Sequence, residues 1–578
     1  ARRKESSRKH VVLFCTSLWY TSIISQPIIH QTIWVAMGKQ PSVELMSLGL
    51  ASGTTTRTPS ISGPSNECNP QPVNTDLEAS SDDETPLNDE AKAILSKGRT
   101  IVVIAQLVGV QLFSSFCNGI IVIGLPAIAK ALEMEAGLQL WPTSVFYLTA
   151  GSCLMLAGSL ADVLGTRPLI LSANILLAVS ALACGLARNG GEIIAFRGLQ
   201  GVANAMAVPA SVSMISTSVE DGQRRNMGFS CLGFAGPLGF LLGLILGGVF
   251  VDGVGWRPAF YLVAAASFTL GLVGFWALPK NSRPHPRRSI KKQLASEIDW
   301  VGTIISTTGL VAISYALATL SASVHNIKTA TTISLLVVGI ATVPAFICWM
   351  AWQEKTGKPA LIPNSFWQNL SFTSVCIMIL FSTAVINGME VYVSLFFQQV
   401  QGLSALGASI RILPALITAV MINISTGYFV NRMPVVWIVL ASCGLTSISP
   451  MLMAIINPRW TYWKMAFFAQ LLQGISVNVL FTVGLLIISS IFPLRTQALG
   501  GAVFNTCAQL GTSIGLTITS VIADSRTAAS GIVDKTSPDA LMTGYRAVFW
   551  ALFAWMIIVL LAGVFGLRKV GKIGVKRD

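Results

Sequence analysis

Charged residues are scarce in this chain. They make up 11% of its 578 residues, whereas hydrophobic residues make up 53%. Soluble domains carry about 25% charged residues, so this composition, with a mean hydropathy of +0.66, excludes an ordinary soluble protein. The hydrophobic runs are continuous over about 20 residues and do not alternate, which predicts an all-α integral membrane protein rather than barrel strands.

Histidines and paired cysteines are also sparse. All four histidines lie outside the main hydrophobic runs, which excludes histidine as a proton carrier within the membrane: His10, His30, His285 and His325. The ten cysteines are isolated and form no CxxC pair. We interpret them as small packing residues, and we expect no metal site and no disulfide framework.

The motifs of several enzyme classes and of ATPases are missing as well. The chain contains no HExxH, no GxSxG, no paired carboxylates within a hydrophobic run and no Walker loop. We therefore expect neither an enzyme nor an ATP-driven pump, and we expect no cofactor, since an ion gradient would supply the energy. The net charge of +14 comes from basic residues in short loops beside hydrophobic runs, a pattern that does not suggest nucleic-acid binding.

Hydrophobic runs of spanning length predict two six-helix halves with two helices between them. Residues 1–99 form a polar region predicted to be disordered, with an apolar segment at 11–37 that could be a further span or a signal anchor. About fourteen spans follow, of which the twelfth and thirteenth are expected at Met465–Ile488 and Leu499–Ile522. The expected parts are a half at 100–280, a basic loop at 281–298, two inserted helices at 299–353, a half at 354–567 and a basic tail at 568–578.

Lys and Arg are unevenly distributed between alternate loops. About 18 lie on the side that holds the basic loop and the basic tail, and about eight lie on the other side. Because positively charged loops stay in the cytosol, both ends of the 14-span unit are predicted to be cytosolic. We expect a multi-pass protein of the plasma membrane, with the vacuolar membrane as the alternative.

Short motifs recur between the two halves at a near-constant offset. Leu199-Gln200-Gly201 recurs as Leu472-Gln473-Gly474, and the set Gly239, Gly243 and Asp252 recurs as Gly511, Gly515 and Asp524. Related halves in a membrane protein predict a substrate site between them, near the membrane centre, and rocking of one half against the other.

A glycine-rich stretch, Gly233–Gly248, lies within the fifth span. Five of its glycines fall within about 120° of one helix face, which would let another helix approach closely: Gly233, Gly236, Gly239, Gly243 and Gly247. Pro237 removes one backbone hydrogen bond and predicts a bend. A packing face without direct chemistry is the alternative to a functional role.

Two segments, one after the second span and one within the fourth, resemble known sequence signatures. The second span is followed by Gly158-Ser-Leu-Ala-Asp162-Val-Leu-Gly165-Thr-Arg167, and the fourth contains Arg197, Gln200 and Gly201. They resemble the first two signatures of the major facilitator superfamily, Gly-x-Leu-Ala-Asp-x-x-Gly-Arg-Arg and Arg-x-x-Gln-Gly, with Thr166 in place of one arginine. The resemblance implies a cytosolic latch at Asp162 and Arg167, and a role for Arg197 in proton coupling. The alternatives are a tight turn and an arginine that extends to the membrane surface.

The fifth span resembles the third signature of the same superfamily, Gly-x-x-x-Gly-Pro-x-x-Gly-Gly. The matching glycines are Gly239, Gly243, Gly247 and Gly248, whereas Leu244 replaces the proline and the pair Gly236-Pro237 lies earlier. With fourteen spans and the segment Phe397–Ser404, the chain resembles the 14-span drug:proton antiporters, in a fungal style. The resemblance implies the major facilitator fold and export of drugs, toxins or secondary metabolites.

Glu390 is the only carboxylate deep within a predicted span. Members of the superfamily often carry an acidic residue in the first span, where this chain has Cys117. Glu390 lies about seven residues, roughly 10 Å, before the predicted end of the ninth span. Alternating access would change its burial and its neighbours, which together govern whether a carboxyl group holds a proton. We expect Glu390 to carry the coupling proton or to contact a cationic substrate, and a place in the outer vestibule is the alternative.

The expected cargo is a small, largely apolar molecule of low charge. Polar side chains within the spans are candidates for the cavity lining: Asn204, Asn387, Tyr392, Gln398, Asn478 and Asn505. We expect a monomer whose partners are the substrate, protons and the lipid bilayer. The alternatives are a transporter for a sugar, an amine, ammonium or borate, and a receptor that keeps a transporter fold, which is less favoured because unused buried charges are costly.

Overall fold

A computed structural model gives the fold of the chain. It describes residues 97–219, 223–279, 298–322, 329–358, 361–429, 433–492 and 494–568. The apolar segment 11–37, the rest of the polar N-terminal region up to residue 96, nearly all of the basic loop 281–298 and the tail beyond 568 lie outside the described residues. The regular elements of the described residues are all helices, which confirms the predicted fold class.

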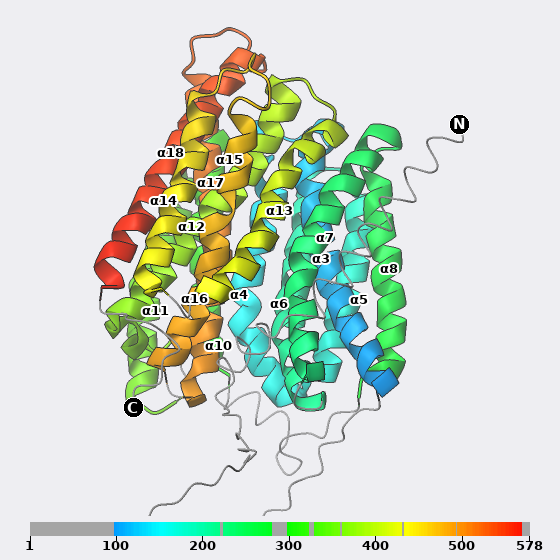
Figure 1. Cartoon of the computed structure of the whole chain (residues 1–578), viewed down its shortest axis with the longest axis vertical. Coiled ribbons are helices and arrows are strands. Elements are labelled where there is room, and N and C mark those ends of the chain that lie inside the picture. The colour runs from blue at the N-terminus through cyan, green and yellow to red at the C-terminus, as the bar shows by residue number, and fades with distance from the viewer. Residues whose placement is uncertain are drawn as a thin grey trace, which may run out of the picture.

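The N-terminal half contains six helices (Figure 1). They are α3 (Lys97–Ala131), α4 (Trp141–Leu164), α5 (Thr166–Leu186), α6 (Gly190–Ser218), α7 (Gln223–Gly253) and α8 (Arg257–Ala277). A one-turn helix, η1 (Ala136–Leu138), lies between α3 and α4.

The inserted pair and the C-terminal half follow. The pair consists of α10 (Trp300–Ala322) and α11 (Ala330–Lys355). The C-terminal half consists of η3 (Asn364–Gln368), α12 (Leu370–Leu395), the π-helical turn η4 (Phe396–Val400), α13 (Ala405–Phe429), α14 (Val435–Ile455), α15 (Ala466–Gln473), α16 (Ile475–Ile491), α17 (Leu494–Ala528) and α18 (Pro538–Gly566).

Polar side chains fix where some of the helices begin. The amide nitrogen of Glu192 donates to the Asn189 side chain at 2.9 Å, and the Glu192 carboxylate accepts a bond from the amide nitrogen of Arg188 at 2.8 Å. This reciprocal arrangement satisfies backbone donors at the start of α6. Asn369 caps α12 by accepting from two backbone nitrogens.

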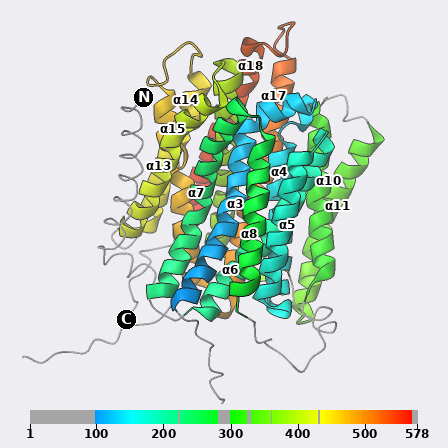
Figure 2. The ribbon, with the colours of Figure 1, turned by 90° about the vertical axis from the view of Figure 1, so that its right-hand side faces the viewer.

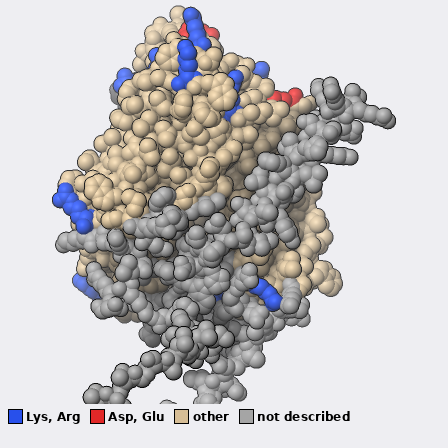
Figure 3. Space-filling model, in the orientation of Figure 1, with Lys and Arg blue, Asp and Glu red and all other residues tan. Residues whose placement is uncertain are grey.

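The number of spans agrees with the sequence prediction. Twelve segments of the described residues are long and apolar enough to cross a membrane, and one of them comprises α15 and α16 together. Adding α6, which carries more polar side chains, and α10, whose apolar part is shorter, gives fourteen. Figure 3 shows a broad surface free of Lys, Arg, Asp and Glu between the charged groups at the upper end and those in the lower part, as a bilayer-facing surface requires.

Corresponding glycines pack in corresponding ways in the two halves. A Cβ atom at Gly239 would lie 2.1 Å from the carbonyl oxygen of Leu112 on α3. In the other half, a Cβ atom at Gly511 would lie 2.0 Å from the carbonyl oxygen of Leu380 on α12. Helices α7 and α17 therefore lie directly against the backbones of α3 and α12, which is what two structurally related halves require.

The course of two predicted spans differs from expectation. The twelfth is interrupted at Gly474, which separates α15 from α16, although a single continuous span was expected. The thirteenth continues past its expected end at Ile522 to Ala528, so Asp524 lies within α17. Helix α7 runs without interruption through Pro237.

The two halves meet along two seams. The first seam is formed by α7 and α13, and the second by α4 and α17. The inserted helices extend the second seam, because α10 contacts both α4 and α17, and Figure 2 shows α10 and α11 at one edge of the bundle. Helix α3 begins and α18 ends at the lower end of the bundle in Figure 1, which we call the terminal side; the opposite end is the distal side.

Candidate functional site

Arg197 lies within α6 and is completely buried. Its Nε donates to the carbonyl oxygen of Pro142 at 3.0 Å, and its two terminal nitrogens donate to Gln200 Oε1 at 2.6 Å and Asn118 Oδ1 at 2.5 Å. The guanidinium carbon lies 4.6 Å from the centre of the Phe146 ring. Arg197 therefore does not extend to the membrane surface, and neutral acceptors and an aromatic face hold its charge.

The close approach of α6 to α4 creates this arginine site. A Cβ atom at Gly201 would lie 2.2 Å from the carbonyl oxygen of Phe146, so only glycine permits this distance between the helices. Thr149 Oγ1 donates to the carbonyl oxygen of Gly198 at 2.8 Å and fixes the same contact. Gln200 follows Arg197 by one helical turn, which places its carboxamide against the guanidinium.

Asn118 on α3 is a site residue that the sequence analysis did not single out. Its oxygen accepts from Arg197, whereas its neighbour Cys117, at the position where the superfamily often has an acid, is buried. The signal for Asn118 in the sequence is an amide within an apolar span, directly beside Cys117. The described residues provide no carboxylate as a hydrogen-bond partner for Arg197.

Glu390 lies on α12, near its distal end, and is partly exposed. Its carboxylate makes no hydrogen bond with the described residues. The phenol of Tyr147 on α4 is within electrostatic reach of both Glu390 and Arg197. Tyr147, another residue that sequence reasoning missed, therefore interacts electrostatically with an acid of the C-terminal half and with the buried cation of its own half.

Hydrogen bonds close the distal side across the two halves. The carboxylate of Asp252, at the end of α7, accepts from the backbone nitrogens of Ala405 and Leu406 at 3.0 and 2.9 Å. These nitrogens begin α13, where a negative charge is favoured by the helix dipole. Ser409 Oγ donates to the carbonyl oxygen of Leu244 at 2.7 Å, and Gln398 Nε2 donates to that of Ile123 at 3.0 Å.

Gly248 brings the first seam together. A Cβ atom there would lie 2.9 Å from the Cα of Leu406 and 2.8 Å from Ser409 Oγ. By contrast, Gly247 faces α3, where the nearest atom to a Cβ would be the Ile123 side chain at 3.0 Å. The last two glycines of the signature therefore serve different contacts, one within the N-terminal half and one between halves.

The predicted glycine face divides into a tight and an open part. A Cβ atom at Gly243 would lie 2.2 Å from the carbonyl oxygen of Phe116, whereas the nearest neighbour at Gly236 is Ser115 Oγ at 3.8 Å and Gly233 has none within 4 Å. Close packing begins at Gly239, after the proline, and not before it.

Gly243→Val should destabilise the packing of α7 on α3 by about 1–3 kcal/mol or more, because the added carbons meet backbone atoms. Gly236→Ala, on the same helix, should have little effect. Thermal unfolding of the purified protein measures the difference between the two variants. Equal losses of stability would contradict the assignment of the tight contact to Gly243.

The loop of the first signature is only partly described. Gly165 has φ +89°, a conformation that favours glycine, and it separates α4 from α5. Arg167 donates to the carbonyl oxygen of Phe275 at 2.7 Å, within its own half, and Gly158 has free space around it. Asp162 lies on α4, but its side chain is outside the described part, so the latch remains a prediction.

The six candidate cavity residues make no hydrogen bonds with one another among the described residues. Asn204 accepts from Ser114 Oγ at 3.1 Å, and Asn505 donates to the carbonyl oxygen of Gly501 within its own helix. Tyr392 is 2% exposed and stacks edge-to-face on Tyr545 within the C-terminal half, with ring centres 5.5 Å apart. Gln398 contributes to the distal closure described above. The cavity role of these residues stays a prediction.

Asn387 and Asn478 lie on two helices that meet at the interruption in the twelfth span. Asn478 donates to the carbonyl oxygen of Gly474 at 2.6 Å and accepts from Asn423 Nδ2 at 2.9 Å. Asn387, one turn before Glu390 on α12, donates to Thr512 Oγ1 at 3.2 Å. The carbonyl oxygen of Gly474 is therefore already occupied, and contact of these residues with substrate stays a prediction.

Comparison with known proteins identifies the family to which this sequence is similar. The family model described as "Major Facilitator Superfamily" matches residues 107–459 and 413–577. "MFS-type transporter 1" of Pyricularia oryzae is 34% identical over 525 residues, which are 83% of this chain and 85% of that protein.

More distant relatives carry more specific names. The "Low affinity ammonium transporter" of Saccharomyces cerevisiae is 25% identical over 391 residues, 67% of this chain and 74% of its own length. "Efflux pump terJ" of Aspergillus terreus is 23% identical over 415 residues, 71% of this chain and 76% of its own length.

The fold is also found among solved structures. A bacterial homologue of the human lysosomal transporter Spinster, in an inward-facing and occupied conformation, superposes with a TM-score of 0.60 at 15% identity, covering 82% of this chain and 98% of that one. This likeness concerns the fold alone. On the match of the family model and of the fungal relative over most of its length, the chain is a multi-pass membrane transporter that belongs to the major facilitator superfamily.

Proposed function

We propose that the protein is a proton-coupled exporter of small organic compounds such as drugs, toxins or secondary metabolites. The observation that carries the proposal is Glu390, a carboxylate without a partner in the described residues, held on one half within electrostatic reach of Tyr147 on the other. An ionisable group within a spanning helix is energetically costly, and such groups usually mark functional sites in transporters. A change in its surroundings can make the group bind or release a proton.

Arg197 supports this assignment as the fixed cation of the site. Its hydrogen bonds to neutral acceptors leave its positive charge uncompensated by a carboxylate among its bonded partners. Such a charge would favour release of the Glu390 proton when rocking brings the two groups closer, and would favour proton binding when they separate. Proton movement would thereby be coupled to the conformation of the halves.

The proposed direction of transport is from the cytosol to the other side of the membrane. We propose that the terminal side is cytosolic, in the plasma membrane or the vacuolar membrane, because the basic loops lie on that side. The distal closure through Asp252 and Ser409 suits a state that receives cargo from the cytosol. The efflux pump among the relatives supports export. We further propose that the protein works as a monomer and needs no cofactor.

Transport of ammonium or a small amine is the second candidate. It is favoured by the 25% identical ammonium transporter, which covers 67% of the chain. Glu390 could contact a cationic substrate directly rather than carry a proton. The two candidates differ in what moves, since an amine transporter would not respond to lipophilic organic cations or neutral toxins.

Collapse of the proton gradient should stop export. With the purified protein in liposomes, a lipophilic dye such as ethidium should move against its gradient only while a pH difference exists, and nigericin should abolish that movement. Protein-free liposomes provide the control. Dye movement that persists after nigericin treatment would overturn proton coupling, and uptake of methylammonium without dye movement would favour the second candidate.

A further inference from the structure

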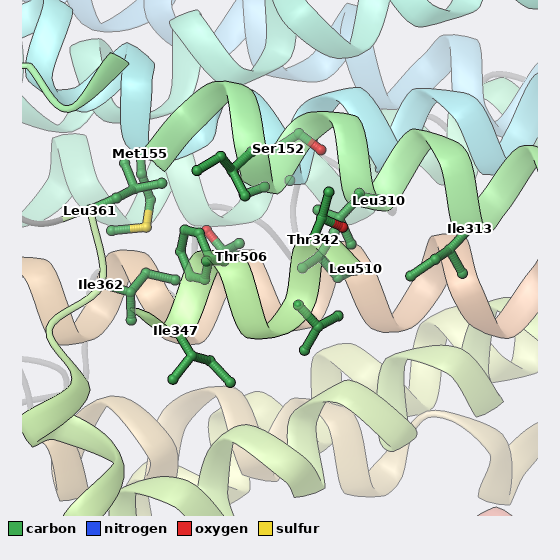
Figure 4. A pocket seen from close by; sticks show the side chains of 16 residues that line it. Ser152, Met155, Leu310, Ile313, Thr342, Ile347, Leu361, Ile362, Thr506 and Leu510 are labelled. Atoms are coloured by element: carbon green, nitrogen blue, oxygen red, sulfur yellow. The ribbon is translucent and has the colours of Figure 1, made fainter. Parts of the chain in front are cut away.

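A cavity of about 210 Å³ lies beside the second seam, and neither Glu390 nor Arg197 lines it. Its wall combines residues of α4 and α17, one helix from each half, with residues of the inserted α10 and α11 (Figure 4). Leu361 and Ile362, in the segment after α11, close one side. The proposed transport chemistry uses none of these side chains.

Most of the polar atoms at this cavity are already satisfied within their own helices. Ser152, Ser306 and Thr342 each donate to a backbone carbonyl oxygen three or four residues earlier, at 2.8, 3.0 and 2.7 Å. The hydrogen atoms of these hydroxyl groups are therefore already engaged in bonds within their own helices and are not available to a ligand in the cavity. The remaining lining is apolar, with Met155 and Leu510 among the residues labelled in Figure 4.

Thr506 is the exception. It is 8% exposed, it lines the cavity, and its Oγ1 is buried without a hydrogen-bond partner. A buried hydroxyl that lacks a partner costs about 1–3 kcal/mol, so a ligand that supplies an acceptor would gain by binding there. In the structure this Oγ1 has almost no accessible surface, so rotation of the Thr506 side chain about its Cα–Cβ bond would present the hydroxyl to a ligand in an otherwise apolar space.

The volume limits the size of an occupant. An apolar cavity of about 150 Å³ binds benzene. At about 210 Å³, this cavity has room for a somewhat larger compound, such as a fused pair of aromatic rings.

We propose that this cavity is a second binding site, for a lipophilic small molecule that carries one hydrogen-bond acceptor. The ligand would lie between the inserted helices and the second seam, and would accept a bond from Thr506 Oγ1. Because α4 and α17 belong to different halves, the ligand would contact both halves at once. None of its lining residues is among those proposed to handle protons or cargo, so its occupancy can be measured without transport.

Equilibrium binding of 2-acetylnaphthalene to the protein in lipid nanodiscs tests the proposal. Binding above that of empty nanodiscs should saturate at one molecule per protein. Thr506→Val keeps the shape of the side chain and removes the hydroxyl, so it should weaken binding about fivefold. The same variant should leave the binding of 2-isopropenylnaphthalene, in which a methylene group replaces the carbonyl oxygen, unchanged.

Two further variants complete the experiment. Ser306→Phe places a ring in the cavity and should reduce the affinity for both compounds more than about tenfold. Thr517→Val, on the same helix but with its hydroxyl bonded to the carbonyl oxygen of Ser513, should change neither affinity. The absence of saturable binding, as when lipid chains occupy the space, would overturn the proposal. So would equal effects of Thr506→Val and Thr517→Val.

Discussion

Glu390→Gln should reduce proton-driven transport more than about tenfold. Glutamine has nearly the same shape and can still hydrogen-bond, but it cannot bind and release a proton at this position. Exchange of labelled for unlabelled substrate across the membrane, which needs no net proton movement, should continue. Transport driven by a pH gradient and substrate exchange should be measured on the same liposomes, because only their ratio separates a coupling defect from a folding defect.

Glu354→Gln is the matched control for this variant. Glu354 is exposed near the end of α11, so its substitution should leave both activities at the level of the original protein. If Glu390→Gln retains full gradient-driven transport, Glu390 does not carry the proton. If exchange is also lost while thermal unfolding shows that the variant remains folded, Glu390 contacts the substrate, as the amine-transport candidate requires.

Gly248→Val should open the distal side. The valine side chain would meet the backbone of Leu406 and the hydroxyl of Ser409, which lie within 3.0 Å of an added Cβ. Overpacking of about 1–3 kcal/mol shifts an equilibrium between closed and open states by about five- to 150-fold. Distances between spin labels at Val254 and Arg459, both exposed near the distal ends of the two halves, should therefore lengthen.

Two variants test whether this effect belongs to the first seam. Gly233→Val, on the same helix, adds carbons where nothing lies within 4 Å, so the label distances should not change. Asp252→Ala removes the acceptor of two backbone bonds and should shift the distances in the same direction as Gly248→Val, by less, because Asp252 is exposed. A closed distal side in Gly248→Val would contradict the proposed role of this contact.

Much of the fold could be predicted from the sequence because lipid imposes simple rules on it. Continuous apolar runs can only be helices in a membrane, and the recurring glycines at Gly239 and Gly511 occupy matching contacts against neighbouring helices. Arg197 is buried within the protein, as expected because a charged side chain that faces lipid within a span is energetically costly. These inferences depend on local sequence and on spacing.

The rest depends on contacts between distant segments. Nothing within α3 indicates that Asn118 rather than Cys117 meets Arg197, since the answer depends on the rotation of three helices. The capping of α13 by Asp252 joins residues more than 150 positions apart. At the interruption beside Gly474, the backbone nitrogen of Ser476 donates to Thr446 Oγ1 on α14 at 2.9 Å instead of to a carbonyl oxygen of α15, a contact that a count of apolar residues does not detect.

The partners of Arg197 also bear on how the protein is made. Helix α6 is not among the twelve segments that are apolar enough to span a membrane by composition, so it gains less than the others from entering lipid alone. Asn118 and Pro142, which accept hydrogen bonds from its arginine, belong to helices synthesised earlier. When α6 leaves the ribosome, these acceptors are already in the membrane. If α3 and α4 remain near the point of insertion until α6 arrives, their acceptors would lower the cost of placing this arginine in lipid.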